Sequence, residues 1–289
     1  SFSFKLNIME QQFQDISNKQ KASWNKFSSG WSKWHESLND HMQPASDGII
    51  NLLKPGGSQK ILDVASGAGE PGFSIAARLT DGKVIMTDLA DEMLNFAREH
   101  ASEKKISNVD FNVCDVSELP FAENSFDAVS CRMGFMFFPD MLLAAKEIFR
   151  VLKPGGRFAT AVWTGADKNP WLTAIAEPIK RNMQLPDQAA GVPGVFRCSP
   201  DGLMKGVFVE AGFKNITESE VGCKLQCGTA ERYWQMMNEI AAPIVSALGK
   251  ADDAMINKIK QEVIGSINEK HADGKLILDG SCLLIYGKK

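Results

Sequence analysis

The chain has 289 residues, of which 44% are apolar and 23% are charged, and this composition is typical of a globular protein that can bury a large core. The formal net charge of −3 and the scattered basic residues provide no field for a polyanion, so we expect that nucleic acid is not the main partner. No window approaches the roughly 18 consecutive apolar residues of a transmembrane helix, so we expect none.

The cysteines and the N-terminal residues both bear on the compartment. Six widely spaced cysteines, several of them inside apolar runs, are typical of reduced, buried thiols rather than of a disulfide framework. The first residues lack the basic start and apolar middle of a signal peptide, so we expect a cytoplasmic protein. We expect no metal site, because no second close pair and no nearby histidine complete a tetrahedral set around Cys223 and Cys227.

The first predicted element is a helix with an aromatic stripe. Five apolar side chains recur at three- and four-residue spacings, namely Trp24, Phe27, Trp31, Trp34 and Leu38. Such a stripe packs into a core or covers a binding site, and the two roles are compatible. We interpret residues 1–43 as an N-terminal helical lid and residues 44–289 as the main domain.

From residue 60 the pattern changes to short apolar strands that alternate with amphipathic helices. The predicted strands are 60–65, 83–87, 109–114, 128–131 and 157–163, and the predicted helices between them are 73–79, 92–104 and 141–152. Continuous apolar strands separated by helices indicate a parallel sheet covered on both faces. The sequence therefore predicts a doubly wound α/β fold.

The C-terminal part is less regular. Residues 164–200 are rich in proline and glycine, and we interpret them as an irregular insertion near the substrate. The further predicted elements are a helix at 203–211, a strand at 216–225, and helices at 229–248 and 252–270. A turn at Asp279-Gly280 is predicted to join two final antiparallel strands.

The most informative motif lies between the first strand and the first helix of the alternating region. Residues 61–72 read Ile-Leu-Asp-Val-Ala-Ser-Gly-Ala-Gly-Glu-Pro-Gly. Gly67 and Gly69 allow a sharp turn and the close approach of a ligand, and the helix that follows presents free N–H groups. The element therefore predicts a nucleotide-like cofactor. It also satisfies G-x-G-x-x-G, so on its own it allows a dinucleotide.

Three acidic residues follow the predicted sheet in order. Asp63 lies in the first strand, Asp88 ends the second, and Asp115 comes directly after the third. In a doubly wound sheet the ligand lies at the carboxyl ends of the strands. Asp88 can accept hydrogen bonds from ribose hydroxyls, and Asp115 can reach the exocyclic amine of a base. Leu89 and Met93 offer apolar surface to the face of that base.

These motifs resemble the class I S-adenosylmethionine-dependent methyltransferases, and most of all the branch of ubiquinone/menaquinone-biosynthesis C-methyltransferases and related small-molecule enzymes. The matching segments are Leu62–Gly69, Thr87-Asp88, Cys114–Phe121, Ser125–Val129 and Leu152–Phe158. The resemblance implies a Rossmann-like seven-stranded, mostly parallel sheet with an antiparallel last strand and helical lid insertions. It places the cofactor core at about 58–163 and substrate-side insertions at about 164–200 and 226–275.

The resemblance also implies S-adenosyl-L-methionine as cofactor. The implied cofactor residues are Asp63, Ala65, Gly67, Gly69, Asp88, Leu89, Met93, Asp115, Val116 and Cys131. The loop backbone would hold the methionine end, with Asp63 supporting its ammonium. Asp88 would bind the ribose, and Asp115 with the Val116 N–H would read the adenine. Cys131 would offer its backbone to the ammonium side. One departure is Ala65, where the commonest pattern has glycine.

The implied reaction is methyl transfer to carbon or oxygen of a small, partly apolar acceptor that is quinol-like, phenol-like or lipid-like. The Asn/Asp-Pro-Pro-Tyr/Phe motif of many amino-group methyltransferases is missing, which disfavours nitrogen. The candidate catalytic residues are His35, His41 and Arg132, the last as an anchor for an anionic substrate. His100 is predicted to lie on the surface. The sequence assigns no oligomeric state.

Two alternatives stay open at this point. The glycine motif alone allows an NAD(P)-binding oxidoreductase, although Asp63 precedes the loop, Pro71 occupies the turn, and Asp115 would have no role there. A catalytically silent cofactor-binding protein is the other alternative, because the motifs contain no obligatory catalytic residue.

Overall fold

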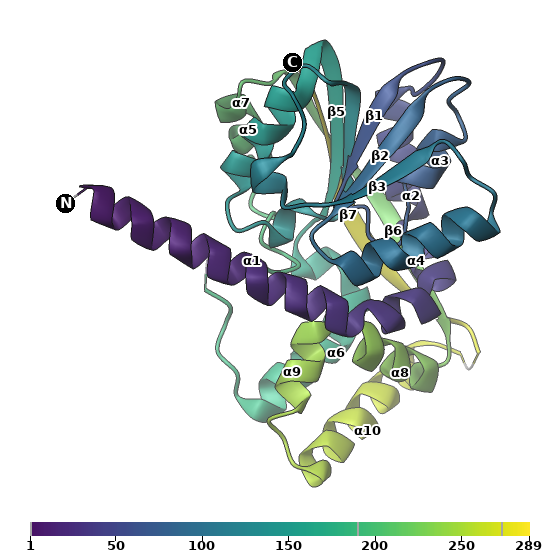
Figure 1. Ribbon diagram of the computed structural model, residues 1–289. Coiled ribbons are helices and arrows are strands. Elements are labelled where there is room, and N and C mark those ends of the chain that lie inside the picture. The colour runs from purple at the N-terminus through teal and green to yellow at the C-terminus, as the bar shows by residue number, and fades with distance from the viewer. Residues whose placement is uncertain (1, 190, 273) are drawn as a thin grey trace.

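A seven-stranded sheet with the order β3-β2-β1-β4-β5-β7-β6 organises the computed structural model, which describes residues 2–189, 191–272 and 274–289 (Figure 1). The strands are β1 (Lys60–Val64), β2 (Lys83–Asp88), β3 (Val109–Val113), β4 (Phe126–Arg132), β5 (Leu152–Trp163), β6 (Lys214–Gly228) and β7 (Leu276–Lys288). Strands β1 to β5 pair in parallel, and β7 is antiparallel to both β5 and β6. The predicted mostly parallel sheet with an antiparallel last strand is confirmed.

Helices cover both faces of the sheet. They are α1 (Phe2–Lys33), α2 (His35–Leu53), α3 (Gly72–Ala76), α4 (Asp91–Glu103), α5 (Met141–Val151), α6 (Pro170–Met183), α7 (Leu203–Ala211), α8 (Ala230–Ile240), α9 (Ala242–Leu248) and α10 (Asp253–Lys270), with short 3₁₀ turns η1 (Val116–Glu118), η2 (Phe135–Phe137) and η3 (Ala166–Lys168). Figure 1 shows α5 and α7 on one face and α2, α3 and α4 on the other. Strand β1 is buried from Ile61 to Val64, as a central strand between two helical layers must be.

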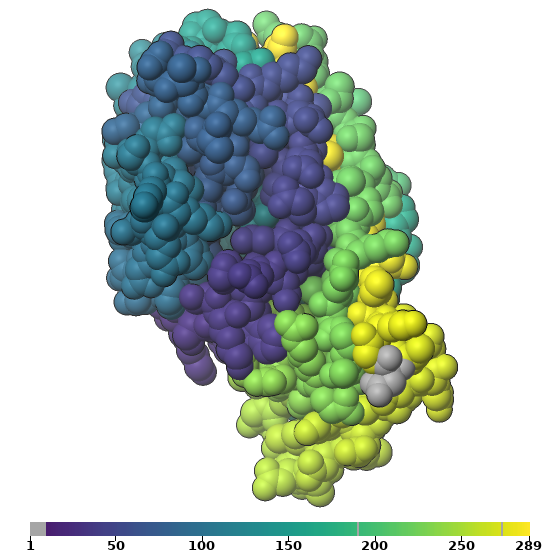
Figure 2. All heavy atoms as spheres, turned by 90° about the vertical axis from the view of Figure 1, so that its right-hand side faces the viewer, coloured from purple at the N-terminus to yellow at the C-terminus, as the bar shows by residue number. Residues whose placement is uncertain are grey.

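Helix α1 connects the sheet to the cluster formed by α6, α8, α9 and α10. It packs against α4 on one side and α8 on the other. In Figure 2 the purple N-terminal segment lies between the blue part of the sheet layer and the green and yellow helices. Gly30 permits the approach, because a Cβ atom there would lie 2.0 Å from the carbonyl oxygen of Glu239. Trp31 Nε1 then donates a hydrogen bond to the carbonyl oxygen of Ile240 at 3.2 Å.

The segment expected to be irregular contains a helix, α6. Pro170 stands in the first turn, where the missing N–H costs nothing. Trp171, Ile175 and Ile179 are buried at a helical spacing. Pro178 lies inside the helix. Because proline usually interrupts a helix, its presence in the sequence argued against a helix here. The expectation of an irregular insertion at residues 164–200 is wrong for this part of the segment.

The predicted turn at Asp279-Gly280 is also wrong, because β7 is continuous from Leu276 to Lys288. Both residues pair in register with β6, Asp279 with Lys224 and Gly280 with Cys223. A Cβ atom at Gly280 would lie 2.9 Å from the Trp171 ring and 3.0 Å from the His41 ring. The glycine therefore makes room for packed rings and does not form a turn.

Three smaller differences concern element ends. The predicted helix at 229–248 is divided into α8 and α9 just before Pro243, whose missing N–H interrupts the helix. Strand β5 begins at Leu152 rather than at the predicted residue 157, so residues 152–156 also belong to the strand. The proposed domain boundary after residue 43 falls inside α2, whose Met42 and Ala45 are both buried.

Several features of the described residues bear on membranes, metals and thiols. None of their helices combines the length and apolar character that crossing a bilayer demands. Within the described ranges, no three His, Cys, Asp or Glu side chains gather closely enough to hold a metal ion. All six cysteines are free thiols, and Cys223 Sγ lies 3.6 Å from Cys282 Sγ.

Candidate functional site

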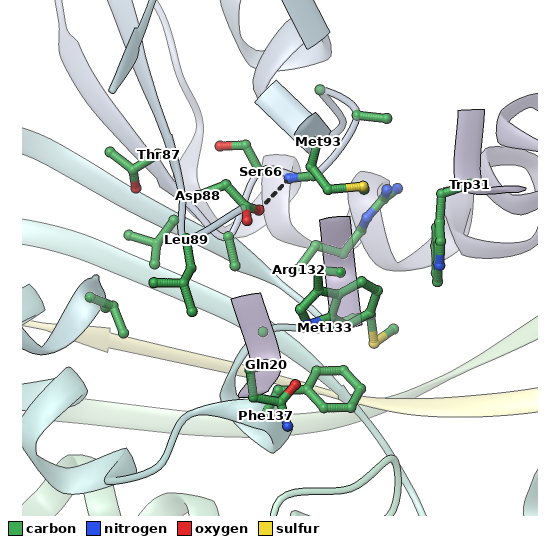
Figure 3. A pocket seen from close by; sticks show the side chains of 18 of the residues that line it. Gln20, Trp31, Ser66, Thr87, Asp88, Leu89, Met93, Arg132, Met133 and Phe137 are labelled. Carbon is green, nitrogen blue, oxygen red and sulfur yellow. Dashed lines mark hydrogen bonds between the residues drawn. The ribbon is translucent and has the colours of Figure 1, made fainter. Parts of the chain in front are cut away.

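A cavity lies at the carboxyl ends of the central strands, because strand register brings those ends together. Val64 of β1 pairs with Thr87 of β2 and with Cys131 of β4, so the chain leaves all three strands at the same edge. The loops that follow form one wall of the cavity, and α1 with the beginning of α2 forms the other. Figure 3 shows side chains from both walls facing the same space.

The glycine loop after β1 is held in a backbone conformation that few residues adopt. The φ angles are +53° at Ala65, +53° at Gly67 and +121° at Gly69. A Cβ atom at Gly69 would lie 1.9 Å from the Phe73 ring, so this position requires glycine. Ala65 adopts the left-handed conformation at a cost of about 1 kcal/mol. Glycine would avoid this cost, and it is the residue at this position in the commonest form of the motif.

Asp88, at the end of β2, links the loop to α4. Its Oδ2 accepts a hydrogen bond from the Gly67 N–H at 2.9 Å (Figure 3). Its Oδ1 accepts one from the Ala90 N–H at 2.9 Å. Burial raises the pKa of Asp88, and these N–H bonds oppose the rise. The carboxylate lines the cavity with lone pairs still open for further donors.

Asp115 follows β3 and lines the cavity next to Val116. Its Oδ1 accepts hydrogen bonds from the backbone N–H of Ser117 at 2.9 Å and from the Ser117 hydroxyl at 2.8 Å. Its Oδ2 accepts a hydrogen bond from the hydroxyl of Ser17 on α1 at 2.8 Å. The carboxylate is thus fixed from both walls of the cavity.

Eight of the ten predicted cofactor residues line this cavity, and two lie beneath its wall. The eight are Ala65, Gly67, Gly69, Asp88, Leu89, Met93, Asp115 and Val116. Asp63 and Cys131 are fully buried and do not line it. Asp63 Oδ1 accepts a hydrogen bond from Ser130 Oγ at 2.5 Å, while Oδ2 has no hydrogen-bond partner. Burial raises the pKa of Asp63 to about 7.

The three catalytic candidates separate. His35 and Arg132 line the cavity, whereas His41 does not. His41 is 1% exposed and stacks on Trp163 with 5.1 Å between ring centroids. Burial lowers the pKa of His41 to about 4, so its ring is neutral at physiological pH. Its packing is that of a core residue.

His35 belongs to a pair of imidazoles beside the glycine loop. Its Nδ1 lies 2.8 Å from the Ser32 carbonyl oxygen, and its ring lies 4.6 Å from that of His100. His100 Nδ1 in turn lies 3.2 Å from the carbonyl oxygen of Ala68. His100, which we expected on the surface, is half-buried and contacts the loop that lines the cavity.

Arg132 extends from the end of β4 along the cavity, between Met93 and Trp31 in Figure 3. Its guanidinium donates to Ser46 Oγ at 2.8 Å and to Asn39 Oδ1 at 3.3 Å. Both partners are neutral, and none of the ion pairs among the described residues includes Arg132. Burial lowers the pKa of Arg132 but leaves a group of this basicity charged.

Sequence reasoning missed the polar residues that α1 and α2 bring to the cavity, namely Ser17, Gln20 and Asn39. Of the aromatic stripe, Trp24 and Trp31 line the cavity, whereas Trp34 Nε1 donates to Glu239 on α8 at 2.7 Å. Gln20 and Ser17 lie one and two turns before Trp24, and this spacing was the signal that could have identified them.

Comparison with known proteins gives the family. A family model described as a methyltransferase domain matches residues 61–156. The chain is 31% identical over 177 residues to the demethylmenaquinone methyltransferase of Bacteroides fragilis, covering 58% of this chain and 72% of that protein. It is 36% identical over 156 residues to the ubiquinone/menaquinone biosynthesis C-methyltransferase UbiE of Rickettsia prowazekii, covering 50% and 61%.

Solved structures show the same fold. The YcgJ protein from Bacillus subtilis has a TM-score of 0.57 at 20% identity, over 85% of this chain and 97% of that one. Phosphoethanolamine N-methyltransferase 2 of Haemonchus contortus, in complex with phosphomonomethylethanolamine and S-adenosylhomocysteine, has a TM-score of 0.58 at 18% identity, over 96% and 60%. The similarity in sequence to the Bacteroides protein decides between the two cofactors that the glycine loop allowed. The chain belongs to the S-adenosylmethionine-dependent methyltransferases, and S-adenosylmethionine is its cofactor.

Proposed function

We propose that this methyltransferase acts on carbon or oxygen of a quinol- or phenol-like acceptor, and that Arg132 holds the oxyanion of that acceptor. S-adenosylmethionine supplies a methyl group that is already activated as part of a sulfonium. The protein has to align the attacking atom and keep the acceptor deprotonated, and alignment alone lowers a barrier by several kcal/mol.

The cavity residues fit the cofactor. The loop from Ala65 to Gly69 exposes backbone without bulky side chains, which suits the methionine end. Asp88 retains open lone pairs for ribose hydroxyls, and Asp115 stands at the next strand end for the adenine amine. Apolar side chains for the adenine faces come from Leu89, Met93 and Val116.

The observation that carries the acceptor class is the environment of Arg132. The hydrogen-bond partners of this buried guanidinium are neutral, and the nearby carboxylates of Glu70 and Asp63 form no hydrogen bond or ion pair with it. An anionic ligand in the adjoining cavity would compensate its charge. A phenol has an ordinary pKa near 10, and a fixed cation beside its oxygen favours the phenolate. The phenolate is the nucleophilic form, both at oxygen and at the neighbouring ring carbons.

The remaining wall suits a planar ring. It is apolar and aromatic, with contributions from Trp24, Trp31, Phe137, Phe138, Leu38 and Met42. Trp24 packs edge-on against Phe137 with 5.2 Å between ring centroids. Similarity to a demethylmenaquinone methyltransferase and to a ubiquinone/menaquinone biosynthesis C-methyltransferase supports an acceptor of this shape.

His35 is the base that we assign to the acceptor hydroxyl. The Ser32 carbonyl oxygen can only accept, so Nδ1 of His35 carries a proton and Nε2 of the neutral ring is free to take one. His35 then removes the proton of the acceptor hydroxyl, and Arg132 stabilises the anion that remains.

The test is methyl transfer from labelled S-adenosylmethionine to a panel of phenols, quinols, the corresponding phenyl ethers, anilines and long-chain acids. We expect turnover of the phenols and quinols, with the label on carbon or oxygen of the product by NMR. Preferential turnover of the amines or the long-chain acids would contradict the proposal.

A further inference from the structure

The hydrogen bond between Ser17 and Asp115 joins the two walls of the cavity. The two residues are 98 positions apart, and the Ser17 hydroxyl donates to Asp115 Oδ2 at 2.8 Å. Ser17 is only 5% exposed, and both residues line the cavity. Ser28, which is equally buried on α1, donates to the Asn25 carbonyl oxygen of its own helix, whereas Ser17 donates across the cavity.

The direction of each hydrogen bond decides what this pair can recognise. Asp115 Oδ1 already accepts two hydrogen bonds, both from Ser117, which leaves Oδ2 as the oxygen with a free lone pair. The hydroxyl proton of Ser17 is committed to Oδ2, so the Ser17 oxygen also presents only lone pairs. The two neighbouring oxygens therefore accept hydrogen bonds and donate none.

We propose that Ser17, a residue of α1, reads the 6-amino group of the cofactor's adenine together with Asp115. A 6-amino group has two N–H donors, and the pair supplies an acceptor for each of them. A 6-keto group at the same position would meet only lone pairs and would be rejected. This inference rests on the proposed placement of the adenine at Asp115, and it adds a residue of the N-terminal helix to the specificity of that site.

Helix α1 is held in place by contacts that do not involve Ser17. Asn25 donates to Asp91 Oδ1 at 3.1 Å and accepts from the Glu92 N–H at 3.2 Å, both at the beginning of α4. Six residues further along α1, Trp31 Nε1 donates a hydrogen bond to the carbonyl oxygen of Ile240 in α8. Removing the Ser17 hydroxyl should thus leave α1 docked, so a change in ligand preference reports on recognition rather than on folding.

The experiment is titration calorimetry of the full chain with S-adenosylhomocysteine and with its 6-keto analogue, S-inosylhomocysteine. We expect the unaltered protein to prefer the 6-amino compound, and Ser17→Ala to reduce that preference by roughly threefold to tenfold. Ser28→Ala is the matched control, because Ser28 is equally buried on the same helix and its hydroxyl donates to the Asn25 carbonyl oxygen of α1 itself. The control should keep the full preference.

Two results would overturn the inference. In the first, Ser17→Ala weakens both ligands by the same factor, so that the serine only supports the helix. In the second, Ser17→Ala behaves like Ser28→Ala. Asp115→Ala separates this inference from the placement on which it rests. If that variant binds S-adenosylhomocysteine normally, the placement itself is wrong. If it binds poorly while Ser17→Ala retains the full preference, only the role of Ser17 fails.

Discussion

Asp88 Oδ2 accepts a hydrogen bond from the Gly67 N–H at 2.9 Å. The carboxylate that we assign to the ribose therefore also fixes the turn of the glycine loop. Its second oxygen accepts the Ala90 N–H at the beginning of α4. One side chain therefore connects the ends of β1 and β2. The consequence is that damage to Asp88 affects the shape of the loop and the binding of ligand together.

We expect Asp88→Asn to lower the free energy of unfolding by about 1–3 kcal/mol, because an amide has one acceptor oxygen for two backbone donors. The affinity for S-adenosylhomocysteine should fall more than tenfold. Urea unfolding and calorimetry measure the two effects. The control is Asp110→Asn, since Asp110 forms an exposed pair with Lys83 on the surface. Equal affinity of the two variants for S-adenosylhomocysteine would show that Asp88 does not bind the cofactor.

The two loop glycines should respond differently to alanine. At Gly69, φ is +121° and a Cβ atom would meet the Phe73 ring at 1.9 Å, so Gly69→Ala should distort the loop and abolish measurable cofactor binding. At Gly67, φ is +53° and the nearest contact would be 3.4 Å, to Met93, so Gly67→Ala should cost about 1 kcal/mol. Thermal unfolding and calorimetry compare the two. Similar losses at both positions would contradict the loop geometry.

Deleting residues 1–22 tests the proposal that α1 acts as a lid. The deletion removes Ser17 and Gln20 from the cavity wall but keeps Trp24 and the contacts of Trp31 and Trp34 with α8. We expect Tm to change by a few degrees and the affinity for S-adenosylhomocysteine to fall at least tenfold. A deletion of residues 1–10 is the control and should bind normally. Unchanged binding and turnover after the deletion of residues 1–22 would contradict the lid role of α1.

Two buried groups should give opposing pH dependences of stability. Burial raises the pKa of Asp63 from 3.8 to about 7, so its contribution is fully present below 3.8 and is lost as pH rises through about 7. Burial lowers the pKa of His41 from 6.5 to about 4, so its contribution is fully present above 6.5 and is lost as pH falls through about 4. In the unaltered chain these slopes partly cancel between those limits.

Single variants separate the two slopes. Asp63→Asn should leave the His41 dependence, so that stability rises with pH over this window. His41→Phe should leave the Asp63 dependence, so that stability falls with pH over the same window. Urea unfolding at a series of pH values measures both. If the stability of both variants changed with pH in the same direction, neither Asp63 nor His41 would be the source of the pH dependence.

Arg132→Gln tests the counter-ion role of the arginine. The variant removes the positive charge but can keep a hydrogen bond to Ser46. We expect KM for a phenolic acceptor to rise by roughly tenfold or more, because a charge-assisted hydrogen bond is lost. The affinity for S-adenosylhomocysteine should change by less than about threefold. Arg132→Lys should recover part of the loss. An unchanged KM would place the acceptor elsewhere.

The strand-end wall of the cavity was predictable because the sequence signals for it are local. Short apolar strands, the glycines of the loop and the acids at strand ends are all visible along the chain, and parallel register brings Val64, Thr87 and Cys131 to one edge. The same logic did not extend to Asp63, which lies within β1 rather than after it. Its side chain is buried beneath the loop and bonds to Ser130.

The parts that could not be predicted depend on packing between distant segments. Gly280 resembles a turn glycine in sequence, yet it is needed because the rings of Trp171 and His41 press against β7. Pro178 resembles a helix breaker, yet it lies within α6. Ser17 carries no motif, and only the docking of α1 across the strand ends brings it to Asp115.

The most direct test of the account is a crystal structure of the protein with S-adenosylhomocysteine. We expect the ligand at the carboxyl ends of β1 and β2, with its ribose hydroxyls on Asp88, its adenine amine at Asp115, and its sulfur on the side of the cavity that Arg132 lines. A ligand bound elsewhere, or one whose ribose makes no contact with Asp88, would contradict it.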